Sequence, residues 1–304
     1  MENRNLLQYS FVTLKGMAMG AADVVPGVSG GTIAFISGIY EELITSINNV
    51  DLALFKSWKE NGFKAAWQKL NGNFLLALFV GIAISIVSLA KLVSWLLENQ
   101  PILIWSFFFG LVVASIVFVG KEVKKWNLGS ITALIIGAVL AYYITTLPPS
   151  ENIESLPFLF LSGALAICAM ILPGISGAFI LVLLGSYKTI IDAVHTVDLK
   201  IISVVGIGAI FGILSFAKLL KWMFTNYKNS TLALLTGFIV GSLNKIWPWK
   251  RVLETKTIGE KIVIIDENVS PFAFEGDNQL IYALISAIVG ISLIFILEKT
   301  ASKK

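Results

Sequence analysis

The chain has 304 residues, of which 56% are hydrophobic and 14% are charged, with a mean hydropathy of +0.83. A soluble domain usually carries about 25% charged residues, so this composition excludes an ordinary soluble protein. Several runs without Asp, Glu, Lys or Arg are long enough to cross a hydrocarbon core about 30 Å thick. The sequence therefore predicts an all-α polytopic membrane protein. One Cys, one His and a net charge of +4 predict no metal site, no cofactor and no nucleic-acid partner.

The first expected element is a broken helical hairpin over residues 11–47, with arms over 11–25 and from Thr32 to about residue 47. Pro26 disfavours helical geometry in the residue before it, and Gly27 permits a turn. A single kinked helix is the alternative. Backbone exposed at membrane depth needs protein or water to satisfy it, so the tip of a hairpin is expected to face a polar cavity.

Residues 50–70 alternate aromatic and Lys residues, which predicts an amphipathic helix at the membrane surface. Three membrane spans are then expected. With the hairpin they complete a first repeat over residues 1–148. The spans cover residues 74–97, 102–120 and 129–147.

A second repeat is expected over residues 149–304. Its first 33 uncharged residues, 155–187, would form a helix about 50 Å long, too long for one span. Pro173 breaks this stretch, so a second hairpin is expected over residues 155–195. The remaining elements are spans over 201–224, 230–247 and 279–298 and an extracytoplasmic loop over 248–278, in which a β-hairpin is expected near 261–274.

The two breaks are nearly the same sequence, Pro-Gly-Val-Ser-Gly and Pro-Gly-Ile-Ser-Gly, 147 residues apart. Each is followed at one spacing by Gly and Tyr: Gly38 and Tyr40, then Gly185 and Tyr187. The spans repeat at an offset of 127 residues, as Ser88 to Trp95 match Ser215 to Trp222. Paired breaks in apolar helices are typical of transporter binding sites.

A hairpin plus three spans is an odd number of crossings, so the two repeats are expected to be inverted in the membrane. When every Lys and Arg except Lys91 and Lys218 is assigned to one side, the side with the N-terminus carries fourteen and the other side seven. This bias favours both termini in the cytoplasm. Inverted repeats permit a monomer and do not exclude a homodimer.

The first tip (residues 26–32) and the second tip (residues 173–177) each open a helix. Free N–H groups and the positive end of the helix dipole favour an anion there, phosphate above all. The alternative for Ser29 and Ser176 is a role as helix N-caps only. The candidate phosphate-binding residues are Gly27, Val28, Ser29, Gly30, Gly31, Thr32, Gly174, Ile175, Ser176 and Gly177.

Three charged residues lie within apolar sequence. An acid at the depth of Asp23 is costly, which favours a role in binding a coupling proton or sodium ion over snorkelling to the interface. Lys91 and Lys218 occupy equivalent places near the ends of their spans. They are candidates for pairing with phosphate, and snorkelling is their alternative.

The segment Gly20-Ala-Ala-Asp-Val-Val-Pro-Gly-Val-Ser-Gly-Gly-Thr32, with the second Leu-Pro-Gly-Ile-Ser-Gly, resembles the bacterial polyprenyl-phosphate transporter family, once catalogued as a domain of unknown function. The resemblance covers essentially the whole chain, although Ala178 stands where the first copy has Gly31. It implies a flippase in the bacterial cytoplasmic membrane that returns undecaprenyl phosphate from the outer to the inner leaflet for cell-envelope synthesis.

Two other functions are alternatives. Undecaprenyl-pyrophosphate phosphatases also have inverted repeats and re-entrant hairpins, with a Pro-Gly-x-Ser-Arg-Ser motif, but Gly30 and Gly177 stand here where that motif has Arg. Without Arg or a metal, the charge that develops in phosphoryl transfer has little to stabilise it. A transporter of a small soluble anion is the other alternative.

Overall fold

The computed structural model describes residues 4–24, 28–150, 155–258 and 261–301. Most of these residues are helical, and four of the described helices are long and apolar enough to cross a membrane. The broken pair α9–α10 adds a fifth candidate. The prediction of a helical multi-pass membrane protein is confirmed at this level. The four helices are α5 (Gly72–Asn99), α6 (Pro101–Glu122), α7 (Leu128–Thr146) and α11 (Leu199–Ser242).

Three helices occupy the region of the first expected hairpin. They are α1 (Leu6–Val24), α2 (Gly30–Ile36) and α3 (Tyr40–Asn48). Gly38 has φ 73°, a left-handed conformation that favours Gly, and its N–H bonds to the carbonyl of Phe35 as α2 ends. The expectation of one continuous arm from Thr32 to about residue 47 is therefore wrong. The chain turns at Gly38 and starts a new helix at Tyr40.

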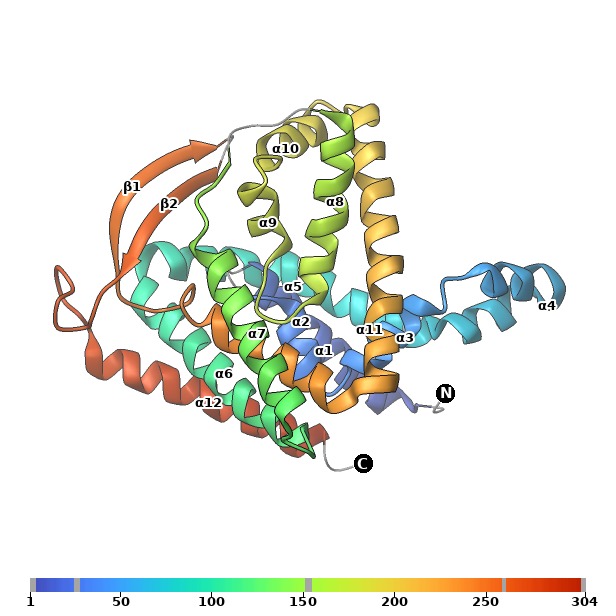
Figure 1. Cartoon of the computed structure of the whole chain (residues 1–304), viewed down its shortest axis with the longest axis horizontal. Helices are drawn as coiled ribbons and strands as arrows, with labels where there is room; N and C mark the ends of the chain where they lie inside the picture. Colours follow the sequence, from blue (N-terminus) through green and yellow to red (C-terminus); the bar gives the residue numbers. More distant parts are fainter. Residues whose placement is uncertain (1–3, 25–27, 151–154, 259–260, 302–304) are drawn as a thin grey trace.

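The second hairpin region has the same three-part order. Its helices are α8 (Leu156–Ile171), α9 (Gly177–Leu183) and α10 (Tyr187–His195). Gly185 has φ 67°, and the axes of α9 and α10 differ by 110°. In Figure 1, α8 and α9 lie side by side and α10 crosses above them. The repeated Gly-x-Tyr pattern thus marks the second break in each repeat.

Helix α4 (Leu52–Leu70) projects from the rest of the molecule at the right of Figure 1. Asp51 caps its start, because its side chain accepts the N–H of Leu54. Gly62 has φ 80° and ψ 176°, so α4 consists of two helical segments joined at Gly62. The sequence predicted one uninterrupted helix over residues 50–70, and the left-handed glycine corrects this.

The second half contains two further corrections. Helix α11 consists of two helical segments with non-helical geometry at Tyr227, between the two expected spans, but the second segment ends at Ser242 instead of continuing to residue 247. The expected loop 248–278 contains the antiparallel strands β1 (Lys250–Ile258) and β2 (Lys261–Asn268). This β-hairpin begins before the expected 261–274 region, since residues 250–258 supply its first strand. Helix α12 (Leu280–Ala301) completes the fold.

Glycines permit the closest helix contacts, because an added Cβ would collide with a backbone carbonyl of the neighbouring helix. The contacts between α1 and α5 recur between α8 and α11, shifted by 147 residues in the first helix and 127 in the second. The contacts pair Gly16 with Leu78, Gly81 with Thr13, Gly163 with Val205, and Gly208 with Phe160. The repeat seen in the sequence is therefore also a repeat of tertiary contacts.

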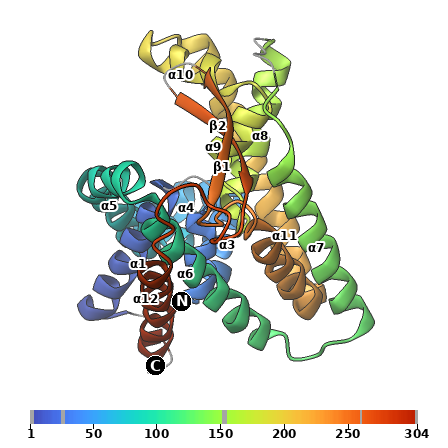
Figure 2. The same cartoon turned by 90° about the vertical axis from the view of Figure 1, so that its left-hand side faces the viewer.

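The last helix of each sequence repeat packs against a helix of the other repeat. Helix α7 lies along the last part of α11, and α12 lies along α6 (Figure 2). Gly137 of α7 approaches the carbonyl of Leu234, and Gly290 of α12 approaches the carbonyl of Phe107. The two repeats are thus interlocked, which places the two tips between them.

Candidate functional site

Ser29 joins the two tips. Its hydroxyl oxygen accepts the N–H of Gly31 at 3.1 Å, so it is the N-cap of α2. The same hydroxyl lies 3.2 Å from the carbonyl oxygen of Leu172 and 3.3 Å from that of Met170, and its single proton is shared between them. These carbonyls lie at the end of α8, where a helix leaves C=O groups without internal partners. The Ser29 hydroxyl at the beginning of α2 therefore provides a hydrogen-bond donor for the carbonyl groups at the end of α8.

A second hydrogen bond links the two tips, and here the second tip supplies the donor and the first tip the acceptor. The hydroxyl oxygen of Thr32 accepts the N–H of Gly174 at 2.9 Å. Gly174 has φ 87°, which favours Gly, and an added Cβ would lie 2.7 Å from the hydroxyl of Ser242. Gly31 lies against the carbonyls of Met170 and Ile171 with no room for a side chain. Residues more than 140 positions apart thus form one compact junction.

Apolar residues anchor both tips. Val28 is 2% exposed and belongs to the main hydrophobic core, while Ile175 is 3% exposed and packs with Phe238 and Ala169. These two residues occupy the variable position of the Pro-Gly-(Val/Ile)-Ser-Gly motif. Their packing in the hydrophobic core fixes the position of the flanking polar backbone, so they are positioning residues.

Asp23 lies in the last turn of α1, and its carboxylate accepts the N–H of Gly30 at 2.7 Å. The side chain of Asp23 therefore occupies the N-terminal end of α2. The expectation that the N–H groups of Gly30 and Gly31 are free is wrong for this conformation, because Asp23 and Ser29 accept them. The N–H groups that open a helix take the nearest acceptor, and here that acceptor is an acid of the same chain.

Among the described residues, the polar groups of the second tip make fewer hydrogen bonds than those of the first tip. Ser176 is the N-cap of α9, but its side chain makes no capping hydrogen bond, and the residue is only partly buried. Pro173 is buried at the turn. The corresponding residues of the first tip, Pro26 and Gly27, lie outside the described residues.

Lys91 of α5 and Lys218 of α11 are exposed. Within the described ranges, neither ammonium group has a hydrogen bond or an ion pair. The structure therefore does not bring these two side chains into contact with the tips.

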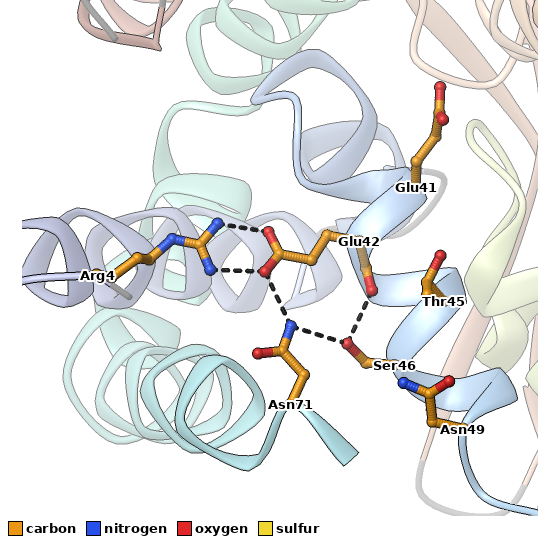
Figure 3. Close-up of a pocket in the computed structure, with 7 residues that line it drawn as sticks. All are labelled: Arg4, Glu41, Glu42, Thr45, Ser46, Asn49 and Asn71. Carbon is orange, nitrogen blue, oxygen red and sulfur yellow. Dashed lines mark hydrogen bonds and ion pairs between the residues drawn. The ribbon is translucent and has the colours of Figure 1, made fainter. Parts of the chain in front are cut away.

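A polar cavity of about 340 Å³ lies beside α3, and its lining includes no residue of either tip (Figure 3). Both terminal nitrogens of Arg4 donate to the carboxylate of Glu42 at 2.6 Å. Asn71 donates to the same carboxylate at 2.9 Å and to Ser46 at 3.3 Å. The network connects the segment before α1 with α3 and with the start of α5.

A second cavity of about 430 Å³ lies beside α10. Most of its polar lining residues follow those of the first cavity by 147 residues, and Asp198 follows Asn71 by 127. The corresponding pairs are Glu41 and Lys188, Glu42 and Thr189, Thr45 and Asp192, and Asn49 and Thr196. The two cavities are therefore equivalent in position but differ in charge.

Sequence reasoning missed the Arg4–Glu42–Asn71 network, because its members are far apart along the chain and none belongs to a motif. The conformation of Asn71 at φ 62°, between α4 and α5, is a partial signal, since Asn tolerates this geometry. Among the described residues, no group of three or more His, Cys, Asp or Glu is arranged to hold a metal ion.

Residues 19–264 match the family model described as undecaprenyl phosphate translocase-like. The chain is 46% identical over 303 residues to a protein of Vibrio cholerae named polyprenyl-phosphate transporter, and the match covers 98% of each chain. It is 32% identical over 254 residues to a protein of Staphylococcus aureus with the same name, covering 77% of this chain and 85% of the relative. No solved structure gives a significant match. The family resemblance expected from the two motifs is confirmed, and the chain belongs to the undecaprenyl phosphate translocase-like family of polyprenyl-phosphate transporters.

Proposed function

We propose that this chain is a flippase that returns undecaprenyl phosphate from the outer to the inner leaflet of the bacterial cytoplasmic membrane. The observation that carries the proposal is the 46% identity over 98% of the chain to a relative named polyprenyl-phosphate transporter. The lipid has one phosphate on a long apolar tail. A flippase therefore needs a polar path for the headgroup only, while the tail remains in the bilayer.

The junction of the two tips is the proposed phosphate site. Of the candidate residues, 28–32 and 174–177 are described, and they place two helix starts and the hydroxyls of Ser29, Thr32 and Ser176 in one region, while Gly27 lies outside the described residues. The contacts between the tips support this assignment, because a phosphate there could be reached from both repeats. The N–H groups already bonded must exchange their internal acceptors for phosphate oxygens.

Asp23 is proposed to couple transport to a proton or sodium gradient. Its carboxylate and a phosphate are both anions that compete for the N–H of Gly30. Protonation of Asp23, or its binding of a cation, would weaken its hold on Gly30 and open the position for phosphate. Substrate binding and cation binding would then be linked by direct competition.

The two repeats are proposed to be inverted, with boundaries near residue 148 and with both termini in the cytoplasm. Alternating access would then exchange the environments of the two tips. The matched helix contacts and the equivalent cavities beside α3 and α10 support a structural repeat.

The deciding experiment places the purified protein in liposomes that contain labelled undecaprenyl phosphate. The expected result is protein-dependent crossing between leaflets without release of inorganic phosphate. Release of phosphate from undecaprenyl pyrophosphate in the same preparation would move the chain to the phosphatase class. Protein that is folded and gives neither result, even under an imposed proton or sodium gradient, would favour a soluble-anion substrate.

Two sets of variants test the site in this assay. Combined Ser29→Ala and Ser176→Ala should abolish crossing while the protein remains folded, and unchanged crossing would exclude the tips. Asp23→Asn keeps an oxygen that can accept the N–H of Gly30 but removes the charge. It should abolish the dependence of crossing on a proton or sodium gradient, and full gradient dependence would exclude coupling through Asp23.

A further inference from the structure

Lys245 lies beside the second tip, although its position in the sequence suggests an outer loop. It follows α11 in a turn in which its N–H bonds to the carbonyl of Ser242 at 2.9 Å. The same Ser242 packs against Gly174 of the tip. The Lys245 ammonium is 5.6 Å from the ring centroid of Phe179, in the first turn of α9. Ser242 at the end of α11 therefore packs against the tip, and Lys245 in the following turn lies over the first turn of α9.

The charge around Lys245 is not balanced. Lys250 pairs with Asp266 at 3.4 Å, and its ammonium donates to the carbonyl of Lys245 at 2.8 Å. In the part of the chain that the structure describes, no carboxylate is within ion-pair distance of the Lys245 ammonium. Burial lowers the pKa of Lys250, and the nearby Lys245 cation also lowers this pKa, although Asp266 raises it. Of these two partly buried cations, Lys250 has an acidic ion-pair partner among the described residues and Lys245 does not.

Aromatic residues hold this turn in place. The indole N–H of Trp247 donates to the carbonyl of Val269 at 2.8 Å, and that of Trp249 donates to the carbonyl of Asn278 at 2.9 Å. The two indole rings pack against each other, and the Lys250 ammonium lies 5.3 Å from the ring centroid of Trp105. Because Lys250 is already paired with Asp266 and lies over Trp105, Lys245 is the charged residue of this turn that can bind a ligand.

Ser176 supplies a hydroxyl at the start of the helix that carries Phe179. It precedes Phe179 by three residues, and the two are the N-cap and the third residue of α9, positions whose side chains lie close together at the start of a helix. The Ser176 hydroxyl makes no capping hydrogen bond. A cation over Phe179 and an available hydroxyl at the start of the same helix form a pair of donors suited to a phosphate monoester.

We propose that Lys245 is a phosphate-binding residue of the second tip, where it acts with Ser176 on the headgroup of the transported lipid. This proposal rests on the proposed function, because it assumes that a phosphate monoester reaches the tip. The first repeat has Phe118 at the position equivalent to Lys245, so this position carries a cation in the second repeat only. The two sides of the transporter would then differ in their affinity for phosphate.

The test measures equilibrium binding by calorimetry in detergent with three probes: a short-chain polyprenyl monophosphate, the matching polyprenol, and inorganic phosphate. Lys245→Gln removes the charge, and Lys245→Arg retains it. Lys200→Gln is the matched control, since Lys200 is exposed and makes no contact with the tips. Loss of a charge-assisted hydrogen bond should weaken binding of the monophosphate about tenfold or more in Lys245→Gln. Lys245→Arg, Lys200→Gln and polyprenol binding should stay near wild type.

The outcomes separate this proposal from the proposed function. Equal weakening of inorganic phosphate binding would support the site and show that it recognises phosphate without the tail. If folded Lys245→Gln binds the monophosphate as tightly as the wild-type protein does, the role of Lys245 is overturned. The role is also overturned if the wild-type protein binds neither the polyprenyl monophosphate nor inorganic phosphate. Intact phosphate binding by a wild-type protein that does not move lipid in liposomes would overturn the flippase and leave this site standing.

Discussion

Small residues occupy the tips because backbone there meets backbone. An added Cβ at Gly31 would press on the carbonyls of Met170 and Ile171, which belong to the other repeat. At Gly30 it would meet the carboxylate of Asp23. Carbonyl groups at the end of a packed helix cannot move away as a flexible side chain can. The glycines of the motif therefore permit close approach between the two repeats as well as local turns.

Gly31→Ala tests this close approach. Separation of the tips should destabilise the junction by about 1–3 kcal/mol, as expected for overpacking, and should strongly reduce lipid crossing in liposomes. Gly120→Ala is the control, because an added Cβ at Gly120 meets nothing within 4 Å. It should keep full activity. Equal activity of the two variants would show that the junction tolerates separation.

The two adjacent acids of α3 should differ in their effect on stability. The side chains of Arg4 and Glu42 are 11% and 27% exposed, whereas those of Lys228 and Glu41 are 54% and 53% exposed. Glu42→Gln removes a largely buried carboxylate and should cost about 3 kcal/mol. Glu41→Gln breaks a solvated pair and should cost at most about 1 kcal/mol. Thermal unfolding in detergent measures both, and similar midpoints for the two variants would contradict this difference.

At the scale of elements, glycines in the left-handed conformation determine where helices stop. Gly38 and Gly185 end α2 and α9, and Gly62 divides α4. Each Gly was visible in the sequence, and the first two were recognised as a repeat. Their role as breaks was not predicted, because Gly is also tolerated inside membrane helices, where it permits close packing. Gly81 and Gly208 show that second use.

Helix α4 is proposed to lie at the membrane surface with its aromatic residues toward lipid. Phe55 is 60% exposed and Trp58 is 54% exposed, and their rings contact each other. Glu60 lies on the opposite face of the same helical segment. An environment-sensitive fluorophore at Phe55→Cys, in a Cys168→Ser background, should emit at shorter wavelength in vesicles than the same dye at Glu60→Cys. Equal emission at both positions would place α4 in water.

At the scale of the whole molecule, the last helix of each repeat packs against a helix of the other repeat. The folding of each repeat therefore depends on the presence of the other. Helix α7 packs on α11 and α12 packs on α6, so neither half buries its helices alone (Figure 2). A rearrangement of one tip is then transmitted to the other repeat through packed helices. Hydrogen bonds from Ser29 and Thr32 add a direct connection.

The proposed inversion predicts opposite accessibility for two connecting segments. In a Cys168→Ser background, Lys59→Cys and Ser150→Cys should react with a membrane-impermeant maleimide from opposite sides of sealed vesicles. The side that labels Lys59→Cys should be the cytoplasmic one, because of the bias in Lys and Arg. Labelling of both positions from the same side would refute the inverted arrangement.

The sequence by itself determined the class of the protein, its repeated motifs and its family. These properties depend on composition and on local pattern: uncharged runs indicate helices in lipid, and Pro-Gly marks a break wherever the rest of the chain lies. Only the tertiary structure decided that Ser29 binds carbonyls at the end of α8, that Asp23 occupies the start of α2, and that Lys245 lies over Phe179. The physical reason is that most of these contacts join segments far apart along the chain. Their formation depends on how both repeats pack, and no local pattern contains that information.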